Sequence, residues 1–218
     1  MPEYASWSND RKLQSFLIDP MAKLYFYYAA MNAGKSTTLL QAAHNYEERG
    51  MNVLLYTPII DDRDGSSTIS SRLGLTREAI PFDQSFDLYA DVASRLQKSP
   101  IHCMFVDECQ FMSAKQVLQI SLVADRLGVP VLCYGLRTDF KGEPFEGSKY
   151  LLAWADELGE IKTICHSGKK ATMNARLDEN GDRVWEGEQI SIGHHYVALS
   201  RKEFRLDKVS PVGYEIEE

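Results

Sequence analysis

Features that mark membrane-bound or secreted proteins are missing from this sequence. No apolar run in its 218 residues approaches the roughly 18 residues that a membrane span needs. Residues 1–20 lack the basic start and apolar centre of a signal peptide. The few cysteines form no paired framework, which favours reduced thiols and a cytoplasmic location; they are Cys103, Cys109, Cys133 and Cys165.

Positive charge is scarce as well. Lysine and arginine number 24 against 31 aspartate and glutamate residues, which gives a formal net charge of −7. This balance argues against a general nucleic-acid-binding surface. An acidic protein can still bind a nucleotide when a few lysines, arginines and backbone N–H groups create a local positive field. We therefore expect small-molecule partners, with no nucleic acid and no membrane.

Strand-like and helix-like patterns alternate over the first two-thirds of the chain. Short apolar runs rich in valine, leucine and aromatics are typical of buried strands, and the segments between them of helices. Such alternation predicts a parallel sheet with helices on its faces. The expected strands are residues 23–30, 52–59, 102–108 and 130–136, and the expected helices are residues 37–49 and 115–127.

The character of the sequence changes after about residue 155. The dipeptide Asn180-Gly181 lies between two polar, β-capable runs and predicts a hairpin. We therefore expect an N-terminal extension, an α/β nucleotide-binding domain, and a small β-rich domain that includes the C-terminal tail. Their expected ranges are residues 1–20, 21–155 and 156–218.

A phosphate-binding loop with one missing glycine joins the first expected strand to the first expected helix. The P-loop pattern is Gly, four residues, then Gly-Lys-Ser/Thr, and Ala29 stands where the first glycine would be. Lys35 would neutralise the β- and γ-phosphates of ATP, and the Ser36 hydroxyl would hold Mg²⁺. The alternative is a helix start that contains Gly-Lys-Ser by chance. The expected ATP-binding residues are Ala29, Ala30, Met31, Asn32, Ala33, Gly34, Lys35, Ser36 and Thr37.

An acidic pair ends the third expected strand, in the segment CMFVDECQF at residues 103–111. Asp107 would hold Mg²⁺ directly or through water, and Glu108 would accept a proton from an attacking hydroxyl. Gln110 is expected beside the ATP phosphates. An acidic turn at the end of a core strand is the alternative. Together with the phosphate loop, the segment predicts a P-loop NTPase-like (RecA-like) parallel sheet with the site at its carboxyl edge.

A charged loop follows the second expected strand. Residues 59–67 read IIDDRDGSS, with acids on both sides of Arg63. A parallel sheet would direct this loop to the same carboxyl edge. Arg63 is therefore a candidate to stabilise charge on the transferring phosphate, and a solvated surface loop is the alternative.

Four segments together resemble the bacterial, type II thymidine kinases of the enteric type. They read YFYYAAMNAGKST, DDR, VDECQF and YGLRTDFKGEPFEGS, and the resemblance extends from Met21 to about Arg201. Small residues other than glycine are familiar at the loop entrance of this family, so Ala29 is compatible with a working site. The resemblance implies that Glu108 takes the proton from the 5′-hydroxyl of thymidine, whose oxygen attacks the γ-phosphate of ATP. It also places Asp61 beside the phosphates.

The resemblance also implies how thymidine is bound. Similar enzymes pack apolar side chains around the thymine ring and hydrogen-bond its edge with the backbone of a "lasso" loop, which would span about residues 173–196 here. On their own, the apolar residues would be taken for ordinary core. The positions that match are Met31, Phe111, Leu136, Phe140 and Phe145 for the ring, and Gln189, Ile190, Ser191, Ile192, Gly193 and Tyr196 for the lasso.

The sequence departs from the family at the base of the lasso. Similar enzymes anchor the loop with a structural zinc, held by a cysteine pair before the lasso and by a cysteine with a second cysteine or a histidine after it. The corresponding positions here are Cys165, Ser167, Ser200 and Glu203. Serine hydroxyls are poor zinc ligands, and one thiolate with one carboxylate is not a closed site. We therefore expect no structural zinc, with the lasso held by packing or ordered by thymidine itself.

The remaining expectations concern partners and alternatives. The resemblance implies thymidine salvage for DNA precursor synthesis, feedback inhibition by dTTP and assembly into a homotetramer. A P-loop ATPase switch or motor shares the same two motifs, and a nucleotide-binding pseudo-enzyme is the third possibility. Intact candidates for every chemical role argue against the pseudo-enzyme; they are Lys35, Ser36, Arg63, Asp107 and Glu108.

Overall fold

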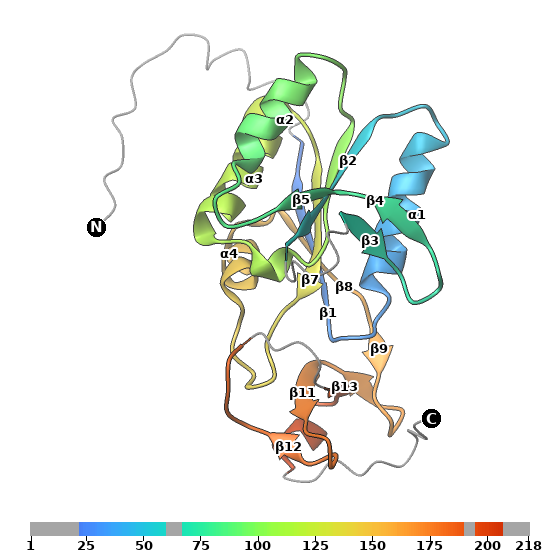
Figure 1. Ribbon diagram of the computed structural model, residues 1–218, viewed down its shortest axis with the longest axis vertical. Coiled ribbons are helices and arrows are strands. Elements are labelled where there is room, and N and C mark those ends of the chain that lie inside the picture. The colour runs from blue at the N-terminus through green and yellow to red at the C-terminus, as the bar shows by residue number, and fades with distance from the viewer. Residues whose placement is uncertain (1–21, 60–66, 190–194, 207–218) are drawn as a thin grey trace, which may run out of the picture.

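The protein is built on one parallel sheet. The structure is a computed structural model that describes residues 22–59, 67–189 and 195–206. Six strands follow the order β5-β2-β6-β7-β1-β8, and every neighbouring pair is parallel (Figure 1). This arrangement confirms the predicted α/β fold. The strands are β1 (Leu24–Ala29), β2 (Val53–Pro58), β5 (Ile80–Phe82), β6 (Cys103–Val106), β7 (Val131–Leu136) and β8 (Glu157–Glu160).

Helices cover both faces of the sheet. In Figure 1, α1 lies on one side, while α2, α3 and α4 lie on the other. Side chains of β6 alternate between the two cores, because successive strand residues point to opposite faces. Phe105 packs in the core with Leu39 of α1, whereas Met104 packs with Ile120 of α3. The helices are α1 (Lys35–Glu47), α2 (Leu88–Leu96), α3 (Ala114–Leu127) and α4 (Glu146–Trp154).

Local signals set where the predicted helices begin. Helix α1 starts two residues before the predicted position 37, because the phosphate loop turns directly into it through Gly34, which has a left-handed φ of 82°. Helix α3 starts at Ala114 behind a capping box, in which Ser113 and Gln116 satisfy each other's backbone N–H groups. Both predicted helices are thus confirmed, with shifts of one or two residues at their starts.

A short hairpin packs beside α1, on the same face of the sheet, before the sheet resumes at β5. Its strands are β3 (Thr68–Ser70) and β4 (Thr76–Glu78), which pair antiparallel. Ile69 is 2% exposed and packs in the core beneath α1, while Arg77 forms an ion pair with Glu47 at the end of that helix. These contacts hold the tip of the hairpin, residues 71–75, near the carboxyl edge of the sheet.

A smaller group of antiparallel strands lies below the main sheet in Figure 1. Strand β11 (Met173–Leu177) is its centre and pairs with β12 (Arg183–Val184) and β13 (His195–Leu199). The predicted hairpin at Asn180-Gly181 is confirmed as the turn between β11 and β12, where Gly181 has a φ of 79°. A further pair is β9 (Thr163–Ile164) with β10 (Lys170–Ala171).

The last strand of the main sheet lies beyond residue 155, where the nucleotide-binding domain was expected to end. Strand β8, residues 157–160, pairs with β1 and therefore belongs to the central sheet. The part outside that sheet begins with β9. The ranges 1–20, 21–155 and 156–218 stay predictions, and residues 1–21 lie outside the described part of the chain.

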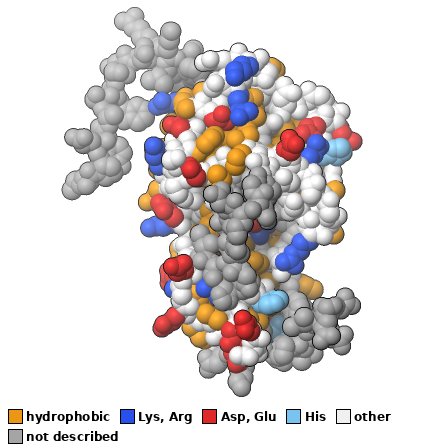
Figure 2. Space-filling model, in the orientation of Figure 1, with side chains coloured by type: hydrophobic (Ala, Val, Ile, Leu, Met, Phe, Trp, Pro, Cys, Tyr) orange, Lys and Arg blue, Asp and Glu red, His pale blue; other side chains and the backbone are white. Residues whose placement is uncertain are grey.

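Charged side chains of both signs are mixed over the described surface. Figure 2 shows acidic and basic side chains interspersed over the visible face, with apolar side chains between them. All four cysteines are free and buried. No helix in the described ranges is long and apolar enough to cross a membrane.

Candidate active site

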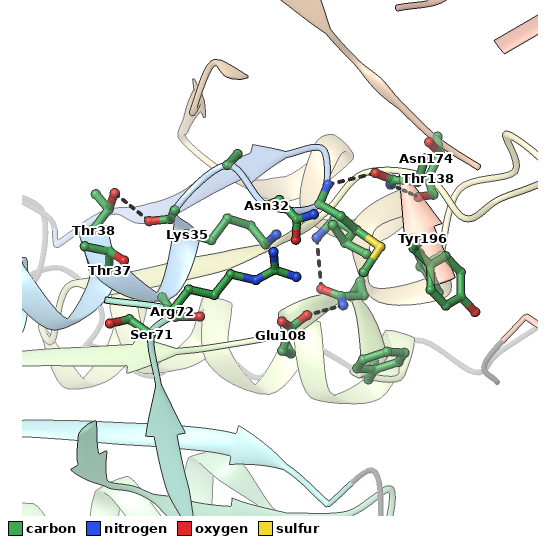
Figure 3. A pocket seen from close by; sticks show the side chains of 18 of the residues that line it. Asn32, Lys35, Thr37, Thr38, Ser71, Arg72, Glu108, Thr138, Asn174 and Tyr196 are labelled. Carbon is green, nitrogen blue, oxygen red and sulfur yellow. Dashed lines mark hydrogen bonds between the residues drawn. The ribbon is translucent and has the colours of Figure 1, made fainter. Parts of the chain in front are cut away.

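A pocket with a volume of about 780 Å³ opens at the carboxyl edge of the sheet. It is lined by the phosphate loop, the segments after β6 and β7, the tip of the β3–β4 hairpin, and three residues of the smaller β region, Asn174, Gln189 and Tyr196 (Figure 3). Parallel strands bring their following segments to one edge, which explains why these stretches meet. The predicted residues that line it are Met31, Asn32, Ala33, Gly34, Lys35, Ser36, Thr37, Glu108, Gln110, Phe111, Leu136, Phe140, Phe145, Gln189 and Tyr196.

The phosphate loop owes its shape to left-handed backbone. Asn32 and Gly34 have φ angles of 62° and 82°. A Cβ added at Gly34 would meet nothing within 4 Å, so glycine is required there by its backbone angle and not by crowding. The Thr38 backbone N–H and hydroxyl both donate to the Gly34 carbonyl, which fixes the first turn of α1. The loop therefore enters the helix in the conformation that phosphate-binding loops use.

The alanines at the loop entrance lie behind the pocket. Ala29 ends β1 opposite Leu136 of β7, and Ala30 is 3% exposed. The Ala30 methyl group packs with Cys165 and Ala171 of the smaller β region. Ala29, which stands at the position of the missing glycine, is also buried, and it has no positive φ, so its backbone conformation does not require glycine. Neither alanine is among the residues that line the pocket.

The lysine and serine of the phosphate loop lie close to the aspartate that follows β6. Lys35 is only 7% exposed, and the Ser36 hydroxyl donates to Asp107 Oδ2 at 2.9 Å. Burial, reinforced by the neighbouring Glu108 carboxylate, raises the pKa of Asp107 to about 6. A hydroxyl and a carboxylate are hard oxygen donors of the kind that Mg²⁺ prefers, so these residues fit that ion.

Glu108 has an unusual backbone conformation, and its carboxylate is held by the amide of Gln110. Its φ of 45° is left-handed, an uncommon conformation for a residue other than glycine. The Gln110 side-chain N–H donates to Glu108 Oε2, and Gln110 Oε1 accepts the Leu136 backbone N–H at 2.9 Å. A Cβ at Gly135 would lie 2.6 Å from Gln110 Oε1, so glycine at this point of β7 permits the close approach. Gln110 thereby orients the carboxylate from a buried position.

Aromatic side chains line the other end of the pocket. The rings of Phe111 and Phe145 meet edge to face, with their centroids 5.6 Å apart. Phe140 is 1% exposed and has the Arg176 guanidinium 3.7 Å from its ring centroid. These side chains belong to the core and also face the pocket, which suits a flat, apolar ring such as a base.

Polar contacts connect this end to the expected lasso. Arg176 is 2% exposed; it donates from Nε to the Tyr196 hydroxyl at 2.9 Å and from Nη2 to the Glu188 carbonyl at 2.8 Å. Gln189 donates to Asp139 Oδ2 at 3.0 Å. Ile190, Ser191, Ile192 and Gly193, together with Asp61 and Arg63, lie outside the described residues, so their predicted roles stay predictions.

The pocket also contains residues that sequence reasoning missed. Figure 3 shows Arg72 reaching from the hairpin tip toward Lys35 and Glu108. Within the described ranges, no carboxylate forms an ion pair with Arg72. An arginine in a turn rich in serine and glycine was the available signal, but its direction depends on how the hairpin folds over α1. The other missed lining residues are Thr38, Ser70, Ser71, Leu73, Thr138, Asp139 and Asn174.

The four positions at the base of the lasso meet in space. Glu203 Oε2 accepts hydrogen bonds from Cys165 Sγ at 2.9 Å and from the Ser200 hydroxyl at 2.7 Å, and the Ser200 backbone N–H also points to it at 3.2 Å. Ser167 Oγ lies 3.2 Å from Cys165 Sγ. These hydrogen bonds, with that from Cys165 the largest cause, lower the pKa of Glu203 to about 2.

Comparisons with known proteins agree with this geometry. The sequence model of the family described as thymidine kinase matches residues 22–204. A thymidine kinase of Xanthomonas campestris pv. campestris is 58% identical over 191 residues, which cover 85% of this chain and 90% of that protein. Thymidine kinases of Vibrio cholerae and Coxiella burnetii are 57% and 56% identical, over 97% and 96% of their own lengths and 85% of this chain.

Proposed function

Because this chain belongs to the thymidine kinase family, we infer that it transfers the γ-phosphate of ATP to the 5′-hydroxyl of thymidine. The product is dTMP, so the reaction salvages a pyrimidine deoxynucleoside for DNA synthesis. The observation that carries this conclusion is the family match over residues 22–204, which spans every element of the pocket. The comparisons give no support to a pseudo-enzyme or an ATPase switch.

The phosphate end of the pocket binds and neutralises the triphosphate of ATP. Backbone N–H groups of the loop and the start of α1 face this end, and Lys35 adds a buried positive charge. We propose that Arg72 adds a second charge from the opposite wall. Ser36 and Asp107 would hold Mg²⁺ between them. When bound there, Mg²⁺ supplies charge neutralisation for the β- and γ-phosphate oxygens.

Glu108 acts as the general base. Its carboxylate takes the proton of the 5′-hydroxyl as the bond from the 5′-oxygen to the γ-phosphorus forms. The bond between that phosphorus and the bridging oxygen of ADP breaks, and ADP leaves with its electron pair. Gln110 keeps the Glu108 carboxylate directed into the pocket through the hydrogen bond described above.

The aromatic end of the pocket binds the nucleoside. We propose that the thymine ring lies among Met31, Phe111, Leu136, Phe140 and Phe145, while the lasso backbone before Tyr196 contacts its edge. A wall made of large apolar side chains discriminates by shape, and backbone groups supply the hydrogen bonds. dTTP carries both a thymine ring and a triphosphate, so the same pocket explains the proposed feedback inhibition.

We also propose that the lasso base needs no zinc. A tetrahedral zinc site takes four thiolate or imidazole ligands, whereas this cluster offers one thiol, one carboxylate and two hydroxyls. The Glu203 carboxylate already accepts the neighbouring donors, so the cluster is satisfied as a hydrogen-bonded unit. Within the described ranges, no group of three or more His, Cys, Asp or Glu is arranged as a metal site. Glu203 thus takes the connecting role that a metal would have.

A homotetramer in the cytoplasm is the proposed state of the enzyme, as the sequence resemblance implies. Gel filtration with light scattering of the full chain tests the assembly, because a tetramer of a 24.7 kDa chain has a mass well separated from that of a dimer. A monomer or dimer at catalytic concentrations contradicts it.

The experiment that tests the function measures transfer of labelled γ-phosphate from ATP to thymidine in the presence of Mg²⁺. We expect label in dTMP, and none with 5′-deoxythymidine, which lacks the acceptor oxygen. A zinc-selective chelator should leave the rate unchanged. Absence of transfer while a non-hydrolysable ATP analogue still binds would favour the pseudo-enzyme instead. Loss of activity with the chelator, restored by zinc, would contradict the metal-free lasso base alone.

A further inference from the structure

Asn174 extends from the smaller β region into the phosphate loop. It belongs to β11 and pairs with Ala198 of β13, yet its side chain leaves that sheet. Its Oδ1 accepts the Met31 backbone N–H at 2.7 Å, and its Nδ2 donates to the Thr138 carbonyl at 3.0 Å (Figure 3). Asn174 is 2% exposed. One buried amide therefore joins three segments that are far apart in the sequence.

The two partners of Asn174 belong to different segments of the pocket. The backbone of Met31 is part of the loop between β1 and α1, which we propose binds the phosphates, although its side chain is proposed to lie beside the thymine ring. Thr138 lies in the segment after β7, next to Asp139, whose carboxylate accepts the hydrogen bond from Gln189 at the start of the nucleoside-contacting stretch. The strand that carries Asn174 also carries Arg176, which holds Tyr196. Asn174 is thus bonded to one segment at each end of the pocket.

The chemistry of both bonds calls for an amide. The Met31 N–H needs an acceptor and the Thr138 carbonyl needs a donor, on two atoms of one short side chain. Asparagine provides both, whereas aspartate provides acceptors alone and leucine provides neither. Without the amide, a partly buried N–H and a partly buried C=O would lose their partners, which costs more than the loss of a fully exposed pair would.

We propose that Asn174 is a positioning residue that couples the ATP site to the thymidine site. It keeps the phosphate loop in register with β11, so binding of ATP rigidifies the segments that receive thymidine. By thermodynamic reciprocity, thymidine tightens ATP binding by the same factor. This inference rests on the proposed function, and it adds the residue through which the two substrates influence each other.

The test is the dissociation constant of thymidine measured by calorimetry with and without a non-hydrolysable ATP analogue and Mg²⁺. The ratio of the two dissociation constants measures the coupling. Because both constants are measured on the same protein, a variant that is only partly folded is not mistaken for one that has lost the coupling. Wild type should show a coupling of several-fold. Asn174→Leu should reduce the ratio to near one and raise the KM values for both substrates by roughly tenfold.

Two further variants complete the test. Asn174→Asp keeps an acceptor for Met31 and loses the donor to Thr138, so its coupling should fall between those of wild type and Asn174→Leu. Asn45→Leu makes the same chemical change at an exposed position of α1 and should keep the wild-type ratio. A ratio of one in wild type, or an unchanged ratio in Asn174→Leu, overturns the inference. Absence of phosphate transfer in wild type would instead contradict the function.

Discussion

The proposed phosphate end and the proposed nucleoside end of the pocket differ in how far apart their residues lie along the chain. Gly34, Lys35 and Ser36 are adjacent, and they need one distant partner, Asp107, to complete their arrangement. The proposed nucleoside end gathers Phe111, Phe145 and Tyr196 from separate segments of the fold. Phosphate binding relies on backbone N–H groups and charge, which a short loop supplies, whereas a flat base needs walls that only packed elements provide.

The largest expected effect is at the residue between the two ends. Glu108→Gln should lower kcat by roughly 10²–10⁴-fold, the usual contribution of a general base. Binding of the ATP analogue should change little, because the variant has nearly the same shape. Single-turnover transfer to thymidine checks this prediction. A rate equal to wild type would show that another group takes the proton.

At the proposed phosphate end, a substitution can test the positive charge of Arg72 independently of the charge of Lys35. Arg72→Ala should raise the KM for ATP by about tenfold or more, the effect of removing a hydrogen bond to a charged group. The KM for thymidine should stay nearly constant. Arg77→Ala, on the same hairpin but paired with Glu47, is the matched control. Equal effects of the two variants would mean that the hairpin matters and the Arg72 charge does not.

Catalysis with ATP and the binding of thymidine should also respond differently to pH. Asp107 must be ionised to hold Mg²⁺, and its raised pKa of about 6 places the protonated, weaker-binding form just below neutrality. The kcat/KM for ATP should therefore fall by up to about tenfold per pH unit below pH 6. Thymidine binding measured without ATP should stay level from pH 7 to 5. A parallel decline of both would contradict the assignment to Asp107.

A substitution at the proposed lasso base should have the smallest effect on the kinetic constants, and it should affect thymidine rather than ATP. Glu203 has a lowered pKa of about 2, so its contribution to stability is fully present above its usual pKa and is lost as the pH falls through about 2. Glu203→Gln removes that charged acceptor at neutral pH. It should raise the KM for thymidine about threefold, because it weakens the partly buried hydrogen bonds at the base of the lasso, and leave the KM for ATP unchanged.

A matched control for this variant is Glu186→Gln, an exposed position of the same β region. Its kinetic constants and melting temperature should equal those of wild type. If Glu203→Gln behaves in the same way, the hydrogen-bonded cluster does not anchor the lasso. Metal analysis of the wild type and of Glu203→Gln provides a separate check. Zinc bound to the wild type in equal molar amount would contradict the metal-free base directly.

Much of the fold followed from the sequence because its signals were local. Alternating apolar runs predicted β1, β2, β6 and β7, and the helices α1 and α3 began within two residues of their predicted starts. The short strands β3, β4 and β5 and the helices α2 and α4 were not predicted. Those strands have three residues each, too few to show a period, and their pairing depends on neighbours far along the chain.

The residue types and their spacing were already set by the sequence: the Gly-Lys-Ser loop, the acidic pair at residues 107–108, and the replacement of the family's zinc ligands by serine and glutamate at three of four positions. These depend on residue type and spacing, which the chain carries in one dimension. Only the tertiary structure decided the directions of Arg72 and Asn174 and the meeting of Cys165 with Glu203. Their contacts join segments distant in sequence, and hydrogen bonds form only where folding has brought a donor to its acceptor.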